Sequence, residues 1–298
     1  MTFKVYTAGL SAILFLTITV LSAPAAHSQS RPKIIWRTID WPPFYIRYGP
    51  HENEGLFDKM IAAYQAALPQ FDHVSLEMST MRAVELIKDR SPNRAVCHAS
   101  ATLNTISEIA HISKVNSIHL HQVIFARKEA AARILSVSKN SDGYVSIEKL
   151  MHEENLRGAI TAFGAHPALE KFQYLDKPFP NITLAADEYQ TLALLLLNGR
   201  VDYIVQYLPY ESTLLSQGGT QLDFVVIPIE ETRNEPYIEG YVGCTKNAVG
   251  KTVIEAVNRV LASKPKSFQE ARIQCYPQRY RAELITAYKK FEPELNNF

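Results

Sequence analysis

Hydrophobic and polar positions follow two different periods in the first part of the chain, and these periods predict alternating strands and helices. The short apolar run 33–39 is rich in β-branched residues and is typical of a strand. Residues 55–68 and 79–90 instead carry apolar side chains at helical spacing, with Ser79 or Thr80 placed to cap the second helix. With further strands after each helix, this order is typical of a mostly parallel sheet with helices on its faces.

A second cycle follows a strand predicted at 121–128 and a charged, serine-rich stretch that we expect to be a polar linker near residues 128–145. In this cycle helices are predicted at 146–156, 164–173 and 191–200, and strands at 158–163, 201–208, 222–229 and 237–246. Two amphipathic helices, 251–263 and 281–291, come last. The pattern predicts an α/β protein of two units, and open α/β sheets bind ligands at the ends of their strands.

The N-terminal residues have the order of a secretory signal peptide. Lys4 precedes an apolar run of about 15 residues, which is shorter than the ~20 needed to span a bilayer as a helix. Small residues then offer cleavage motifs at Ala23–Ala25 and Ala26–Ser28. We therefore expect residues 1–28 to be a signal peptide cleaved near residues 25–28, with an uncleaved anchor as the alternative.

Composition and charge exclude several classes of function. The chain has 298 residues, 47% hydrophobic, with a formal net charge of +1, so no strong field favours nucleic acid or an anionic membrane. We find no G-x-S-x-G, H-E-x-x-H, P-loop or dinucleotide fingerprint, and we predict neither a cofactor nor a catalytic site. His119 and His121 share a strand face, but no acidic residue lies at a matching spacing, so we do not expect a metal site.

Six segments in a fixed order resemble the type II extracytoplasmic solute-binding proteins, in the family 3 branch that includes polar amino-acid binders. The resemblance covers nearly the whole mature chain and rests on motif order and spacing. The segments are "IDWPPFYI…GLFDKMIAAY", "AVCHASATLNTISEIAHIS", "HQVIFARK", "SIEKLMHEENLRGAITAFGA", "LALLLLNGRVDYIVQY" and "YVGCTKNAVGKTVIEAVNRVL".

The resemblance implies a periplasmic protein with two lobes, each a mixed sheet with helices on both faces, joined by a hinge of two crossing segments. The first lobe would comprise 31–127 plus 240–298, and the second lobe 128–239. A small molecule would bind between the lobes, in a monomer that delivers it to an inner-membrane permease or signals to a sensor receptor. No nucleic-acid partner is implied.

Three positions depart from the family pattern for α-amino acids. The place of the family's carboxylate-binding arginine falls at or beside Ile106, with no arginine between Ala99 and His111. Gln206 stands in place of the aspartate that binds the amino group, and Gly164–His166 replace the Gly-Thr turn. Unpaired charges in a closed cleft are costly, so we do not expect a standard α-amino acid as ligand. A subgroup of unassigned ligand is the nearer resemblance.

The candidate ligand contacts lie on the loop after the first strand and at strand and helix ends in both lobes. Aromatic residues beside Pro42 and Pro43 would stack on a flat or apolar part of the ligand, and Arg82 would pair with an anionic group. Core packing, a solvated arginine, strand termination and helix capping are the structural alternatives. The candidates are Trp41, Phe44, Tyr45, Arg82, Ser100, Thr102, Gly164, His166, Gln206 and Tyr207.

The three cysteines allow three disulfide pairings by sequence alone. The family topology places the strand of Cys244 beside the strand of Cys97 and implies that pair, with Cys275 free and Cys244–Cys275 as the second choice. Some proteins of this fold are cyclohexadienyl dehydratases, so a lyase of that kind is the alternative function. Glu54, Glu211 and Glu239 are acid–base candidates for it by residue type alone.

Overall fold

The computed structural model describes residues 1–2, 31–102, 106–138, 142–161, 179–185, 189–235 and 237–291. Met1–Ser30 and Arg31–Phe298 are separate units, and everything below concerns the second. Residues 3–30, and with them nearly all of the predicted signal peptide and its cleavage site, lie outside the described residues. None of the helices in the described ranges is long and apolar enough to cross a bilayer.

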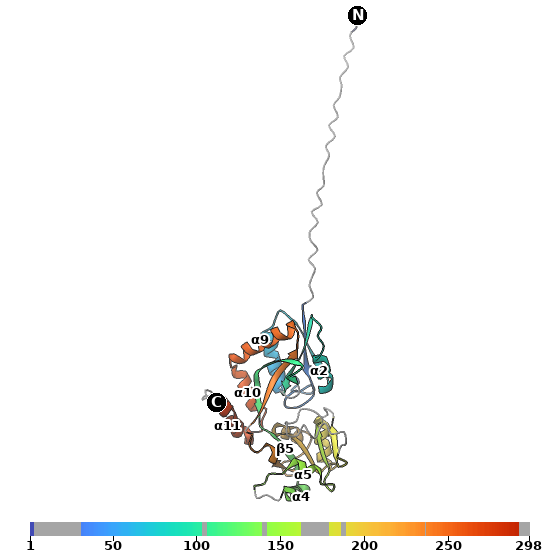
Figure 1. The fold of residues 1–298 in the computed structure, drawn as a ribbon, viewed down its shortest axis with the longest axis vertical. Coiled ribbons are helices and arrows are strands. Elements are labelled where there is room, and N and C mark those ends of the chain that lie inside the picture. The colour runs from blue at the N-terminus through green and yellow to red at the C-terminus, as the bar shows by residue number, and fades with distance from the viewer. Residues whose placement is uncertain are drawn as a thin grey trace. The chain divides into compact units, whose positions relative to one another are not determined.

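The first of two five-stranded sheets is built by residues from both ends of the unit. Its order is β2-β1-β3-β10-β4, with β1–β3 mutually parallel and β10 antiparallel to both of its neighbours. The strands are β1 (Lys33–Thr38), β2 (Asp72–Glu77), β3 (Arg94–Ala101), β4 (Ala110–His119) and β10 (Ile238–Thr245). Two helical layers cover this sheet, since α9 and α2 lie on opposite sides of it (Figure 1).

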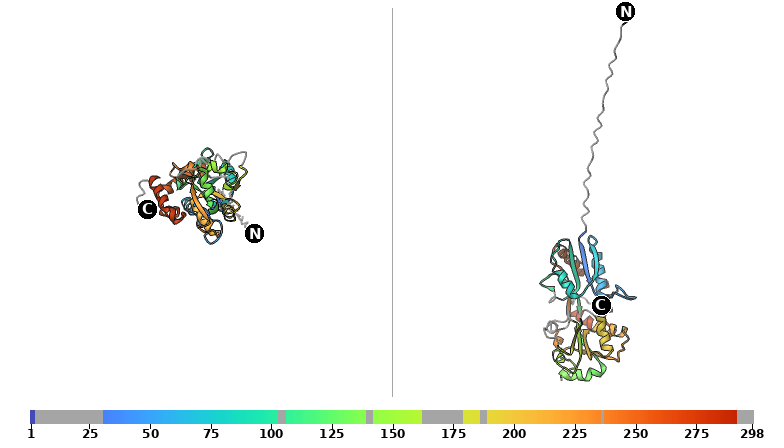
Figure 2. Two further views of the ribbon diagram at one scale, coloured as in Figure 1. Left: turned by 90° about the horizontal axis from the view of Figure 1, so that it is seen from below. Right: turned by 90° about the vertical axis from the view of Figure 1, so that its right-hand side faces the viewer.

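The second sheet is formed by the middle of the chain, in the order β7-β6-β8-β5-β9. β6 is parallel to β7 and β8, whereas β5 is antiparallel to β8 and β9. The strands are β5 (Gln122–Arg127), β6 (Gly158–Thr161), β7 (Ile182–Ala185), β8 (Tyr203–Tyr207) and β9 (Phe224–Pro228). The right-hand view of Figure 2 shows the two sheets as separate groups of strands. This confirms the predicted α/β class with two mixed sheets.

Helices pack on the sheets through the apolar faces that the sequence pattern predicts. On β3, Ala95 and Cys97 join the core under α1 and α9, while Val96 faces a smaller cluster under α2. The helices are α1 (Leu56–Ala66), α2 (Thr80–Ile87), α4 (Lys128–Ser138), α5 (Ile147–Met151), α7 (Tyr189–Leu197), α8 (Glu211–Ser216), α9 (Ala248–Ala262), α10 (Lys266–Gln274) and α11 (Arg281–Phe291), with short 3-10 turns η1 (Leu208–Tyr210), η2 (Glu230–Thr232) and η3 (Gln278–Tyr280). Ser79 caps α2 as predicted, accepting a hydrogen bond from the Arg82 N–H.

The prediction of a polar linker at 128–145 is wrong, because the first half of this segment is the helix α4. Ala130 and Ile134 are one turn apart and buried against the second sheet, which stabilises a helix despite its charged outer face. The predictions also lacked β4, β7 and α10. The predicted helix 164–173 lies outside the described residues.

Two connections cross between the sheets. The first is Leu120–His121, between β4 and β5, and the second runs from β9 through η2 to β10. Our expected boundary kept residues up to 127 in the first lobe, but β5 pairs only within the second sheet. A strand belongs to the sheet that takes its backbone hydrogen bonds, so we propose that the first lobe ends at His121. Two crossings of this kind are what a hinge of two segments requires.

The predicted disulfide is present. Cys97 on β3 and Cys244 on β10 face each other in the strand register and are bonded, whereas Cys275 is a free, buried thiol. The bond therefore ties an early strand of the first sheet to the strand that returns from the second, across 147 residues of sequence.

The first turn of α9 lies unusually close to the end of β10. Asn247 caps the helix by accepting the Gly250 N–H at 2.8 Å, and a Cβ on Gly250 would come within 1.9 Å of the Thr245 carbonyl oxygen. We expect Gly250→Ala to lower the free energy of unfolding by about 2 kcal/mol, because α9 would have to move off the sheet. Urea unfolding measures this, with Lys251→Ala on the exposed side of α9 as control. Equal stability of the two variants would contradict the close packing.

Candidate functional site

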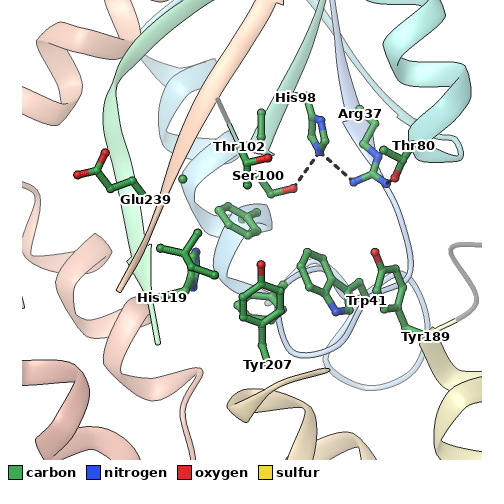
Figure 3. A pocket seen from close by; sticks show the side chains of 15 residues that line it. Arg37, Trp41, Thr80, His98, Ser100, Thr102, His119, Tyr189, Tyr207 and Glu239 are labelled. Carbon is green, nitrogen blue, oxygen red and sulfur yellow. Dashed lines mark hydrogen bonds between the residues drawn. The ribbon is translucent and has the colours of Figure 1, made fainter. Parts of the chain in front are cut away.

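A small cavity lies where the loop after β1 and the end of β3 meet the N-terminus of α7 and the end of β8. Its volume is about 50 Å³, several times the roughly 10–15 Å³ that one water molecule needs. Both lobes contribute to its wall: Arg37, Trp41, Phe44, His98 and Ser100 come from the first, and Tyr189 and Tyr207 from the second. Figure 3 shows Arg37, His98 and Ser100 on one side and Trp41, Tyr189 and Tyr207 on the other.

The aromatic loop, residues 41–45 after β1, contacts the second lobe. The Trp41 ring stacks on the Tyr189 ring, with centroids 4.8 Å apart and planes inclined by 19°. Trp41 and Phe44 also pack against Tyr207, at 5.9 and 6.0 Å. Trp41 is half-buried and Phe44 is buried, and both line the cavity. Tyr45 takes the alternative role, because it is fully buried in the core and donates its hydroxyl to Ser100 Oγ at 3.2 Å.

Hydrogen bonds from the second lobe hold the same loop. Thr213 Oγ1 donates to the Pro42 carbonyl at 3.0 Å, and Gln190 Nε2 donates to Asp40 Oδ2 at 2.5 Å. Asp40 also accepts the Arg47 N–H. These contacts fasten the loop to α7 and α8, so the described conformation is closed over the cavity.

Arg37 brings a buried positive charge to the wall. Its side chain comes from β1, is 2% exposed, and donates to the Met78 carbonyl at 3.3 Å, to Thr80 Oγ1 at 2.9 Å and to His98 Nε2 at 3.1 Å. Within the described residues no carboxylate lies within ion-pair distance of it. A buried cation of this kind calls for a negative partner.

Two histidines of the wall are held neutral. Burial, and then the positive charge of Arg37, keep the pKa of His98 well below its usual value. Burial also lowers the pKa of His119 to about 3, with a smaller contribution from Arg272. Because Arg37 can only donate, His98 Nε2 is the acceptor and its proton sits on Nδ1. The Ser100 hydroxyl lies 3.0 Å from the same nitrogen, which continues a polar chain toward Tyr45.

The structure separates the predicted contacts into three groups. The cavity wall includes five of them: Trp41, Phe44, Ser100, Thr102 and Tyr207. Three lie elsewhere: Tyr45 in the core, Arg82 exposed on α2, and Gln206 buried inside the second sheet. Gly164 and His166 lie outside the described residues. A role in binding remains a prediction for each of the five.

Sequence reasoning missed Arg37, Thr80, His98, His119 and Tyr189 as wall residues. For Arg37 a signal existed, because a charged residue interrupts the apolar run 33–39 directly before the aromatic loop. His98 likewise interrupts a buried strand. Tyr189 carried no such signal, since its place depends on how the second sheet meets the loop.

None of the acidic candidates points into the cavity in the part of the chain that the structure describes. Glu54 is exposed, and Glu211 is buried in an ion pair with Arg279 away from the wall. Glu239 borders the cavity, but its carboxylate points away from the other labelled side chains and accepts the Tyr241 hydroxyl (Figure 3). Among the described residues no group of three metal-ligating side chains gathers.

Comparisons with known proteins give structural matches only. No protein-family model and no curated protein sequence matches the chain. A periplasmic binding protein of Salmonella typhimurium with high arginine specificity is similar at TM-score 0.57 and 13% identity, covering 82% of this chain and 98% of that one. An amino acid ABC transporter substrate-binding protein of Streptococcus pneumoniae, bound to L-arginine, is similar at TM-score 0.57 and 14% identity, covering 85% and 96%.

A third neighbour is an ancestral amino acid-binding protein described as a precursor of cyclohexadienyl dehydratase. It is similar at TM-score 0.55 and 13% identity, and the match covers 83% of this chain and 96% of that chain. Identities this low establish architecture and leave the ligand open. The chain therefore has the two-lobed α/β fold of the periplasmic binding proteins, as the resemblance predicted.

Proposed function

We propose that this chain is an exported solute-binding protein that captures a small molecule with a flat or apolar part between its two lobes. The observation that carries this is the cavity wall, which combines Trp41 and Phe44 of the first lobe with Tyr189 and Tyr207 of the second. A ligand touching both walls would be buried only in the closed state, so binding would favour closure. The protein would act as a monomer in the periplasm and pass its ligand to a permease, or signal to a membrane receptor.

A thermal-shift screen of the mature protein tests this proposal. Amino acids, organic acids, polyamines and small aromatic compounds are each titrated, and at least one class should raise the melting temperature progressively with concentration. Flat curves across all classes would refute a small-molecule binder. Prephenate belongs in the same screen, since its turnover would instead support the dehydratase-like lyase. The described residues direct no carboxylate into the cavity for such chemistry, and for this reason we favour binding.

Trp41→Ala should weaken binding of any compound found in that screen by about tenfold or more. The variant loses a ring that stacks on Tyr189 and forms part of the wall, and an aromatic contact of this kind contributes roughly 1 kcal/mol beyond its area. Isothermal titration calorimetry measures the change. Tyr48→Ala is the matched control, because Tyr48 follows on the same loop but is 65% exposed and lies outside the wall. Equal losses in both variants would place the ligand elsewhere.

A further inference from the structure

Arg37 has hydrogen-bonding capacity that the described residues do not use. A guanidinium carries five N–H donors, and three are assigned to the Met78 carbonyl, Thr80 and His98. Nε makes one of these bonds and each terminal nitrogen makes one, which leaves one N–H on each terminal nitrogen. Two adjacent donors of this kind form the fork that binds a carboxylate bidentately.

Apart from Arg37 itself, the side chains that face this fork carry no charge. His98 and His119 are uncharged, and within the described wall the one acidic side chain, Glu239, points away from Arg37 (Figure 3). A desolvated cation without an opposite charge is costly, so an incoming anion would gain both the pairing and the relief of that cost. An ammonium group would find no carboxylate here.

The size and charge of the site favour a monoanion. Arg37 is the one cationic side chain in the described wall, whereas a phosphate dianion commonly recruits several donors or charges. The cavity is only about 50 Å³ in this closed form, and the rings of Trp41, Phe44 and Tyr207 line it together with Arg37. A planar group next to the carboxylate would lie against these rings.

We infer that the ligand is a small carboxylate with a flat or apolar body and no ammonium group, whose carboxylate is bound by Arg37. This inference rests on the proposed function and names the ligand class for the same site. It differs from an amino-acid site in lacking the partner for a positive charge, and its cation comes from β1, directly before the aromatic loop.

Paired probes test the inference without any mutation. Benzoate and phenylacetate are compared by calorimetry and thermal shift with benzamide, phenylacetamide, phenylalanine and inorganic phosphate. We expect at least one of the two carboxylates to bind, and its amide to bind about 100-fold more weakly, because the amide cannot form a charged fork. An amide that binds as well as its acid, phenylalanine binding more tightly than phenylacetate, or binding of phosphate alone would each overturn the inference.

Variants then locate the site. Arg37→Gln should reduce carboxylate binding by about 100-fold, and Arg37→Lys by less, since lysine keeps the charge but loses the fork. Arg82→Gln removes the same charge from the exposed face of α2 and should bind as the unaltered protein does. Unchanged binding by Arg37→Gln would overturn the inference. Should Arg37→Gln fail to fold, the acid and amide comparison on the unaltered chain still decides.

The outcomes also separate this inference from the proposed function. If neither carboxylate binds but a neutral or cationic compound in the wider screen does, and Trp41→Ala weakens it, the protein is a solute-binding protein and the carboxylate assignment is wrong. If nothing binds, both are wrong.

Discussion

We expect the free energy of unfolding of the double variant Cys97→Ala/Cys244→Ala to be about 5 kcal/mol lower than that of the unaltered protein. In the chain-entropy description, a cross-link restricts the unfolded chain more as the closed loop lengthens, and a loop on the order of 150 residues corresponds to about 5 kcal/mol. The two cysteines are 147 residues apart, and the loop they close contains all of the second lobe. This is close to the whole stability of many domains.

Urea unfolding monitored by circular dichroism measures the effect. The unaltered protein unfolded in a reducing buffer should approach the stability of the double variant, since both then lack the bond. Cys275→Ala is the control, because that thiol is buried and free, and burial raises its pKa well above the usual range. A double variant as stable as the oxidised protein would show that the bond adds nothing to the fold.

Much of the fold is legible in the sequence because it rests on local patterns. The spacing of apolar residues predicted β1, α1, α2 and α9 correctly. Gly199 follows the end of α7 with a φ of +66°, a backbone conformation that few other residues adopt. The linker prediction failed at α4 for a physical reason. The charged residues of this segment indicated an exposed linker, but two apolar residues, Ala130 and Ile134, are enough to bury one face of a helix.

The candidate site was only partly predictable, because a site depends on contacts between distant segments. The stiff aromatic loop was recognisable from Trp41 to Tyr45, but which ring entered the core and which entered the cavity depended on α1 and α7. Arg37 illustrates the same limit. Its charge is evident in the sequence, yet its value as a ligand group depends on His98 and Thr80 being beside it and on no carboxylate being near within the described residues.

The C-terminal segment supports the hinge in a way that sequence patterns do not reveal. The Tyr276 hydroxyl accepts the Leu120 N–H at 3.0 Å, at the first crossing between the sheets. The Tyr288 hydroxyl accepts the Ile118 N–H at 3.1 Å, just before that crossing. Arg279, between the two tyrosines, pairs with the buried Glu211 of the second lobe. The end of the chain thus contacts both the first crossing between the sheets and the second lobe.

Acid should destabilise the protein well before its carboxylates titrate, and His98 and His119 are the expected cause. Burial holds the pKa of both below the usual 6.5, that of His119 at about 3, so His119 stays neutral in the folded state at pH 5, and His98 takes up its proton at a lower pH than in the unfolded chain. In the unfolded chain both become protonated as the pH falls below about 6.5. The unfolded state then binds more protons, and stability decreases toward low pH by up to about 1.4 kcal/mol per pH unit for each histidine.

Between pH 7 and pH 5 this amounts to about 2 kcal/mol for His119, and His98 adds a loss of the same sign. Asp58 has the opposite sign, since burial raises its carboxyl pKa and protonation favours the folded state. Urea unfolding at half-unit steps from pH 7 to 5 measures the slope. His119→Gln should remove the part of the slope that His119 contributes, about 2 kcal/mol over this range. An unaltered slope in His119→Gln would mean that this histidine is protonated in the folded protein, and the cavity would then carry a second positive charge beside Arg37.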